Sequence, residues 1–66
     1  MSRISAEWLQ SPSTGRFIVR LKGNHLVRGE GANRSAATQA FLRACKSQTG
    51  LSSDRKSYII RKAKVD

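Results

Sequence analysis

The sequence contains few of the residues on which metal sites and disulfides depend. Its 66 residues include one cysteine, one histidine and four acidic residues. A single cysteine cannot form an internal disulfide, so nothing here indicates an oxidising compartment. One cysteine and one histidine also cannot complete a four-ligand zinc site without carboxylates at suitable spacing. We therefore expect no metal and no other cofactor.

The same shortages argue against catalysis. His25 has no carboxylate close to it in the sequence that would orient it as a base. The carboxylates are scattered, whereas paired-carboxylate chemistry needs two of them held in a cleft. Cys45 falls on the apolar stripe of a predicted helix, where a thiol lacks the exposure and the base that a nucleophile needs. We expect a binding protein and not an enzyme.

Long apolar runs are absent as well. No stretch approaches the roughly 20 apolar residues of a membrane span, and residues 1–10 hold no apolar run of signal-peptide length. The sequence therefore predicts a cytoplasmic protein, in a host cell if its source is viral. A chain of this length makes one domain, residues 1–66, with a thin core. We expect homodimerisation or a partner to contribute to its stability.

Positive charge is what the sequence has in excess. Thirteen Lys and Arg residues against four Asp and Glu residues give a net charge of +9. Such a charge attracts polyanions over a distance. Nucleic acid, DNA or RNA, is the commonest polyanion that a small intracellular protein meets, and an acidic protein surface is the alternative partner.

Residues 16–22 form the clearest predicted strand. Phe17, Val19 and Leu21 alternate with mostly basic positions, which is the period of two typical of a strand. A turn cluster rich in serine, with one proline and one glycine, precedes this strand at residues 11–15.

A second strand is predicted to return along the first. Gly23 and Asn24 suit a tight hairpin turn, and residues 25–28 follow them. The register stays open: a two-residue loop pairs Leu21 with Leu26, whereas a bulged loop pairs Val19 with Val27. The glycine-rich segment after this strand is expected to end it.

A helix is predicted between an N-terminal cap at Asn33 or Ser35 and a stop at Gly50. Asparagine and serine side chains accept hydrogen bonds from exposed backbone N–H groups, and glycine adopts the left-handed conformation that ends helices. One face repeats at helical spacing and is apolar through Cys45. This stripe consists of Ala37, Ala40, Phe41, Ala44, Cys45 and Gln48.

Residues 58–65 predict the final strand, because they begin with aromatic and β-branched side chains and then alternate. Residues 4–9 fit either a short strand or one helical turn, and the sequence leaves this open. The predicted order is strand, strand, helix, strand. This is a small two-layer α+β module, in which the helix covers the apolar face of a mostly antiparallel sheet.

The placement of the basic residues carries the functional prediction. In the first strand they share the pleat face opposite the apolar residues, and none of the predicted strands contains an acidic residue. Charge runs are often only solvated surface, and lysines on an edge strand also hinder aggregation, but solubilisation alone would mix the signs. Cations on a bare sheet face suit a phosphate backbone. The predicted nucleic-acid contacts are Arg16, Arg20, Lys22, Arg28, Arg34, Arg61, Lys62 and Lys64.

Two weaker signals accompany this surface. The glycine-rich residues 29–35 match neither the Walker pattern nor the dinucleotide fingerprint. With Arg34 and Ser35 in the first helical turn they would suit one phosphate, or the glycines only turn the chain. Trp8 and Tyr58 could stack on a base, although covering the edge of the core is the favoured interpretation. With few exposed aromatic residues, we expect binding that is dominated by the phosphate backbone and that discriminates little between nucleic-acid sequences.

A resemblance to a known family rests on three segments: residues 15–21, the turn at Gly23 and Asn24, and residues 35–41. Together they resemble the arm-type DNA-binding domains of tyrosine recombinases. In those domains a basic hairpin leads into a helix with alanine and aromatic packing residues. The predicted strand after the helix departs from that pattern. The element order is also similar to small phage proteins that bind and inhibit host RNA polymerase, and to certain small ribosomal proteins. The alternative function is therefore a regulator that docks on an acidic surface of a host enzyme such as RNA polymerase.

Overall fold

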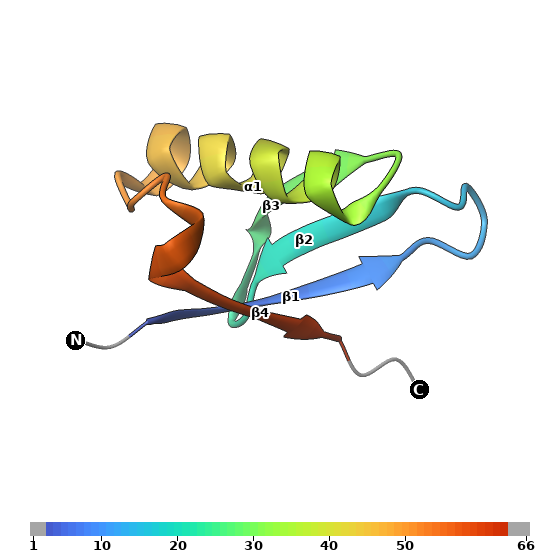
Figure 1. The fold of residues 1–66 in the computed structure, drawn as a ribbon, viewed down its shortest axis with the longest axis horizontal. Helices are drawn as coiled ribbons and strands as arrows, with labels where there is room; N and C mark the ends of the chain where they lie inside the picture. Colours follow the sequence, from blue (N-terminus) through green and yellow to red (C-terminus); the bar gives the residue numbers. More distant parts are fainter. Residues whose placement is uncertain (1–2, 64–66) are drawn as a thin grey trace.

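The computed structural model describes residues 3–63, which form one sheet and one long helix in two layers (Figure 1). The sheet has the strand order β3-β2-β1-β4, and α1 lies over one of its faces. The predicted α+β module is confirmed, and the undecided N-terminal segment is a strand. In chain order the elements are β1 (Ile4–Gln10), β2 (Phe17–Leu21), β3 (Asn24–Gly31), α1 (Arg34–Thr49), the short 3₁₀ helix η1 (Arg55–Ser57) and β4 (Tyr58–Lys62).

The N-terminal strand β1 lies in the interior of the sheet. It pairs antiparallel with β2 and parallel with β4, so the sheet is mixed. A parallel pair requires a crossover connection, and the chain makes it from β3 to β4 through α1. The final strand ends at Lys62 and not at residue 65 as predicted, and residues 64–66 lie outside the described part of the chain.

The hairpin turn between β2 and β3 lies one residue earlier than predicted. Lys22 and Gly23 form it, and Gly23 has a φ of 95°, which glycine adopts at little cost. An irregularity in the ladder follows, and neither predicted register occurs, because Arg20 pairs with Arg28. Extra residues at a bulge interrupt the alternation of the strand, so a period of two cannot reveal them.

β3 continues through the glycines that were expected to end it. Gly29 and Gly31 pair with residues of β2 and are buried beneath α1. A Cβ atom on Gly29 would lie 2.0 Å from the backbone nitrogen of Phe41, and one on Gly31 would lie 2.6 Å from that of Ala37. The glycines therefore allow the helix backbone to approach the sheet closely. Their role in this fold is packing, and they do not form a flexible loop.

The ends of α1 follow the predicted capping chemistry. The Asn33 side chain accepts a hydrogen bond from the backbone N–H of Ala36 at 2.8 Å. Gly50 has a φ of 72°, and its N–H donates to the carbonyl of Lys46. The predicted stripe faces the sheet, although Gln48 at its end is exposed.

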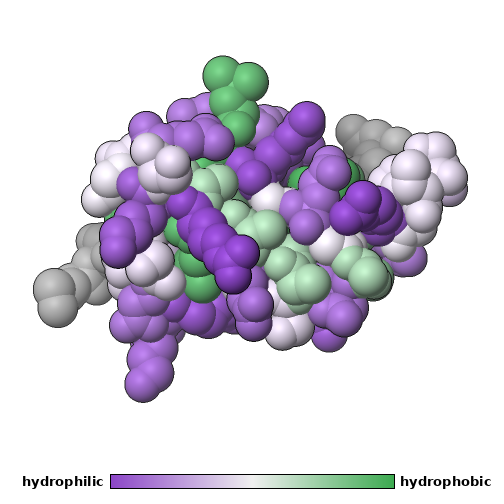
Figure 2. Space-filling model, turned by 90° about the horizontal axis from the view of Figure 1, so that it is seen from above, coloured by the Kyte–Doolittle hydropathy of each residue, from purple (hydrophilic) through white to green (hydrophobic). Residues whose placement is uncertain are grey.

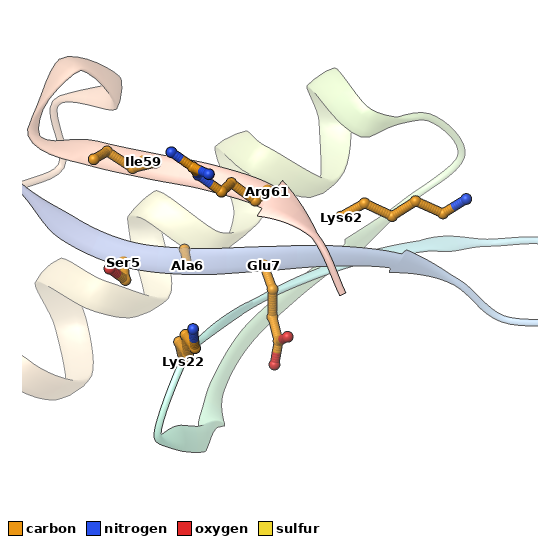
Figure 3. Close-up of a pocket in the computed structure, with 7 residues that line it drawn as sticks. All are labelled: Ser5, Ala6, Glu7, Lys22, Ile59, Arg61 and Lys62. Carbon is orange, nitrogen blue, oxygen red and sulfur yellow. The ribbon is translucent and has the colours of Figure 1, made fainter. Parts of the chain in front are cut away.

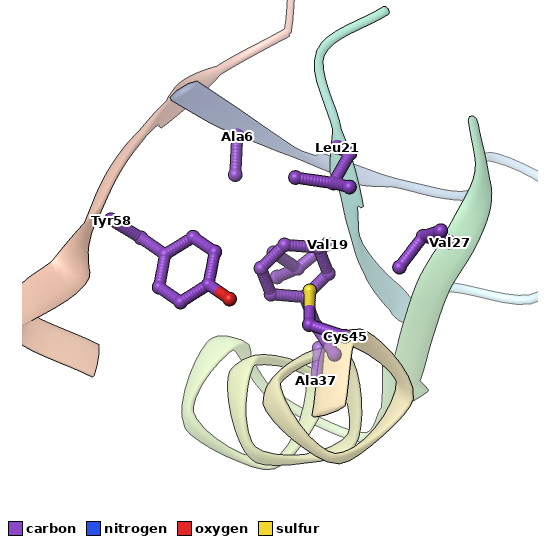
Figure 4. Packing of buried hydrophobic residues seen from close by; sticks show 8 residues of the cluster. Ala6, Val19, Leu21, Val27, Ala37, Cys45 and Tyr58 are labelled. Atoms are coloured by element: carbon purple, nitrogen blue, oxygen red, sulfur yellow. The ribbon is translucent and has the colours of Figure 1, made fainter. Parts of the chain in front are cut away.

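The core lies between α1 and the sheet (Figure 4). The Phe41 and Tyr58 rings pack edge to face, with centroids 5.3 Å apart. The Tyr58 hydroxyl donates to the carbonyl of Ser52, which satisfies the polar end of a buried side chain. The predicted core position of Cys45 is confirmed, and burial raises the pKa of its thiol. The cluster consists of Ala6, Val19, Leu21, Val27, Ala37, Phe41, Cys45 and Tyr58.

The helix packs mainly on β3 and β2. β1 and β4 are therefore less covered on the helix side, and a groove runs beside α1 there. Among residues 3–63, no helix combines the length and the hydrophobicity needed to cross a bilayer.

Candidate nucleic-acid interface

The sheet face turned away from α1 is the first candidate surface, and we call it the open face. No other helix or strand within residues 3–63 packs over it (Figure 1). Side chains alternate between the two faces of each strand, so the pairing register assigns each residue to one face. The open face consists of Ser5, Glu7, Leu9, Ile18, Arg20, Lys22 at the turn, Arg28, Glu30, Ile59 and Arg61.

Charged side chains form one row across all four strands of the open face. Arg28 on β3 pairs with Arg20 on β2, Arg20 pairs with Glu7 on β1, and Glu7 pairs with Arg61 on β4. Directly paired residues project from the same face of a sheet. Three guanidinium groups from three strands thus share a row with a single carboxylate.

Glu7 holds the centre of this row. The Arg20 Nε donates to Glu7 Oε1 at 2.9 Å, and the His25 Nε2 lies 3.0 Å from the same oxygen. Only 17% of the Glu7 side chain is exposed, compared with 26% for Arg20. The carboxylate thereby offsets the repulsion between the paired Arg20 and Arg28 side chains.

The expectation of strands free of acidic residues is therefore wrong. β1 contributes Glu7, and the extension of β3 to Gly31 brings Glu30 into that strand. Both acidic residues belong to segments that the sequence did not assign to strands. Without that assignment, neither carboxylate could be placed on the open face.

Part of the open face is hollow (Figure 3). The hollow has a volume of about 540 Å³ and lies between the turn at Lys22 and the strands β1 and β4. Figure 3 shows the Glu7 carboxylate projecting away from α1, with Lys22 beside it. The residues that line the hollow are Ser5, Ala6, Glu7, Lys22, Ile59, Arg61 and Lys62.

Apolar side chains accompany the charges on this face. Leu9 pairs with Ile18, and both are half-buried. Ile59 on β4 is 36% exposed, and Leu26 near the irregular part of β3 is 85% exposed. The surface is therefore basic with apolar patches. The sequence predicted mostly basic residues on it, with Ile18 as the exception in its strand, but not the apolar residues of the neighbouring strands.

The predicted contact residues separate into two groups. Four of the eight lie together on the open face: Arg20, Lys22, Arg28 and Arg61. Arg16 is exposed and directly precedes β2, and Lys64 lies outside the described residues. The other two, Arg34 and Lys62, lie on the helix side.

Arg34 and Lys62 meet at Trp8. The Arg34 Cζ lies 4.9 Å from the centroid of the Trp8 ring, and the Lys62 Nζ lies 5.9 Å from it. Both distances fall within the range of cation–π attraction. Lys62 lies on this side because it pairs with Trp8 on the helix face of the sheet, whereas the neighbouring Arg61 faces the opposite way.

Trp8 and Arg34 line a groove between α1 and β4, which we call the Trp8 groove, and Lys62 lies beside it. It has a volume of about 280 Å³ and is lined by Trp8, Arg34, Ser35, Thr38, Arg55 and Ile60. Arg55 was not among the predicted contacts. It lies in η1, and the loop before β4 offers no periodic pattern that would have placed it there.

Trp8 also packs against the core, as the favoured sequence interpretation expected. It is half-buried and contacts the buried cluster, and its ring centroid lies 6.0 Å from that of Phe17. Seen from the helix side, the molecular surface is mostly hydrophilic, with some hydrophobic patches and one hydrophobic projection at its edge (Figure 2). Tyr58, the other aromatic considered for stacking, is only 2% exposed and belongs to the core.

No protein-family model matches this chain, and no curated protein or solved structure matches it either. The function is therefore argued from the geometry of the chain itself.

Proposed function

We propose that the protein binds nucleic acid through its phosphate backbone, with the open face as the contact surface. The observation that carries this proposal is the cross-strand row, in which Arg28, Arg20 and Arg61 project from one uncovered face. Lys22 extends the row at the turn. Guanidinium groups donate paired hydrogen bonds to phosphate oxygens, which makes arginine well suited to this contact.

The dimensions of the row suit a duplex as well as a single strand. Neighbouring strands lie about 4.8 Å apart, so the row spans about 14 Å from β3 to β4. This span is comparable with the roughly 12 Å width of the major groove of DNA. Cations at the two ends of the row could therefore reach phosphates on both sides of a groove.

The charges on this face predict a small number of phosphate contacts. Glu7 already neutralises Arg20, which leaves Arg28, Arg61 and Lys22 as the cations available to a ligand. Each phosphate contact contributes about −0.9 to the slope of log K against log salt concentration on duplex DNA. We expect a slope near −3 from this face, with little sequence discrimination.

The test is a double substitution, Lys22→Gln with Arg28→Gln. Both side chains are exposed, so the free energy of unfolding should change little. We expect weaker binding to duplexes of any sequence, and a salt slope smaller in magnitude by about 2. Fluorescence anisotropy of a labelled duplex, titrated at several salt concentrations, measures both quantities.

The matched control is Arg43→Gln with Lys46→Gln. These two exposed cations lie on α1, on the other side of the molecule from the open face, and the substitution changes the net charge equally. We expect the control to bind more tightly than the test variant and to retain most of the slope. Equal losses in the two variants, or no binding to DNA or RNA at low salt, would overturn the proposal.

A second candidate function is docking on an acidic protein surface. The apolar side chains of Leu9, Ile18 and Ile59 beside the cations favour it, because a protein partner can cover apolar surface that a phosphate backbone leaves exposed. It predicts that one protein is retained stoichiometrically by the immobilised chain after nuclease treatment. It also predicts that added nucleic acid competes only weakly with that partner.

A further inference from the structure

The Trp8 groove combines an aromatic ring with cations and has no negative charge of its own. Its six lining residues include two arginines and no carboxylate. Lys62 adds a third cation at the rim, since its Nζ lies 5.9 Å from the Trp8 centroid. Within residues 3–63, neither Arg34 nor Lys62 lies within 4.0 Å of a carboxylate. Cations that converge without a counter-charge form a site for an anion.

The Trp8 ring adds a second chemical requirement for the ligand of this groove. Trp8 is half-buried, and its packing against Phe17 and the core holds the ring in place. A fixed indole at the base of a cationic groove provides a flat surface for a nucleobase, and every base has a face that can stack. The Arg34 side chain over the ring is exposed, so a base can displace it and leave the guanidinium free for the adjacent phosphate.

The size of the groove limits what it can hold. Its volume of about 280 Å³ is slightly below the roughly 300 Å³ at which small-molecule pockets begin. One base with its phosphate is therefore a better match than an extended ligand. The hydroxyl groups of Ser35 and Thr38 supply polar lining beside the ring.

β4 connects the groove to the open face. It is an edge strand, and its successive side chains point to opposite sides of the sheet. Arg61 therefore lies on the open face, whereas Lys62 lies beside Trp8 and also lines the end of the open-face hollow. A flexible single strand can follow cations around this edge, but a stiff duplex cannot, because its persistence length is about 50 nm.

We propose that the Trp8 groove binds one unpaired base of a single-stranded nucleic acid, stacked on Trp8, with the neighbouring phosphate held by Arg34 and Lys62. This inference rests on the proposed function, and it extends that function from backbone binding to a preference for single strands. The occupant is a nucleotide within a chain, since the open face would hold the phosphates that follow.

The first experiment needs no substitution, because Trp8 is the only tryptophan in the chain. Its fluorescence is measured while three ligands of equal length are added: single-stranded oligothymidylate, an abasic strand with the same backbone, and a duplex. We expect oligothymidylate to quench the emission and to bind about 5- to 150-fold more tightly than the abasic strand, which is the range for stacking of one base. The abasic strand and the duplex should bind without comparable quenching.

The second experiment separates the groove from the open face. Arg34→Gln should weaken oligothymidylate binding more than duplex binding, because Arg34 lines the groove and not the hollow of the open face. The control, Arg43→Gln, removes the same charge from the exposed side of α1 and should affect the two ligands equally. Trp8→Phe keeps a smaller aromatic face and should reduce the preference for oligothymidylate over the abasic strand without abolishing it.

The outcomes distinguish this inference from the proposed function. If the duplex binds, but oligothymidylate binds no more tightly than the abasic strand and leaves the fluorescence unchanged, the groove proposal is overturned and the open face stands. If none of the three ligands binds at low salt, both proposals fail. Quenching by oligothymidylate that Arg34→Gln weakens selectively supports the groove.

Discussion

At the scale of single residues, Glu7 stands among the arginines of the open face and accepts a hydrogen bond from Arg20 at 2.9 Å. Its carboxylate stabilises the sheet, because it pairs with a positive side chain on each neighbouring strand, Arg20 on β2 and Arg61 on β4. The same carboxylate repels the phosphates of a bound polyanion. Stability and affinity therefore depend on this residue in opposite directions.

Replacing Glu7 with glutamine should separate the two effects. The substitution keeps the size of the side chain and removes its charge, so affinity for duplex DNA should rise about two- to fivefold, the effect of one charge several ångströms away in water. The free energy of unfolding should fall by about 1 kcal/mol with the loss of the ion pair. Anisotropy titration and urea unfolding measure the two quantities.

The control for Glu7 is Asp54→Asn. It changes the net charge equally, and asparagine can still accept the hydrogen bond that Asp54 receives from the backbone N–H of Lys56. We expect a smaller gain in affinity and almost no loss of stability. An unchanged or lower affinity in Glu7→Gln would contradict the assignment of this carboxylate to the binding surface.

At the scale of the elements, the approach of α1 to β3 determines how the core closes. Gly29 lies directly beneath the helix, and a methyl group there would lie 2.0 Å from the backbone nitrogen of Phe41. Backbone cannot move aside as a flexible side chain does. The helix would have to separate from the sheet, which would loosen the packing of Phe41 and Cys45 in the core.

Gly29→Ala should therefore lower the free energy of unfolding by about 3 kcal/mol, the upper part of the usual range for overpacking. For a domain as small as this one, such a loss removes much of the total stability. Thermal unfolding followed by circular dichroism measures it. Glu30→Ala, at the adjacent exposed position of the same strand, should change stability by no more than about 0.5 kcal/mol. Equal effects would mean that α1 does not pack closely on β3.

The elements that the sequence predicts well are those with a strong local pattern. The stripe through Ala37, Phe41 and Cys45 identified α1, and the alternation of Val19 and Leu21 identified β2. β1 was undecided because a segment of six residues is too short for its pattern alone to separate a strand from one helical turn. Its pairing partners β2 and β4 are distant in sequence, and a local pattern does not include them.

The glycines of β3 show a second limit of structure prediction from sequence. A glycine in a sequence indicates a turn, because it lacks a side chain that would favour a strand. At Gly29 and Gly31 the missing side chain is required by the helix above, which is a tertiary contact. The same limits apply to the candidate site. Alternation placed Arg20 and Lys22 on one face, but the face of Arg28 depended on the undecided register of the hairpin. Glu7 and the groove at Trp8 required the position of β1.

At the scale of the whole molecule, a net charge of +9 is carried by a fold whose main buried cluster, within residues 3–63, has eight members. Such a charge opposes the compact state through self-repulsion. Among residues 3–63, the ion pairs involve a single carboxylate, Glu7, so most of the positive charge is not offset internally. A bound polyanion would supply the missing negative charge, and its binding would also stabilise the folded state.

The most direct test of the central claim is NMR of the arginine side chains during addition of a DNA duplex. The Nε–Hε signals of Arg28 and Arg61 report on the open face, and that of Arg43 reports on the exposed side of α1. We predict that the first two signals shift together as the duplex is added, while the Arg43 signal stays in place. A shift confined to Arg43, or equal shifts at all three arginines, would contradict binding through the open face.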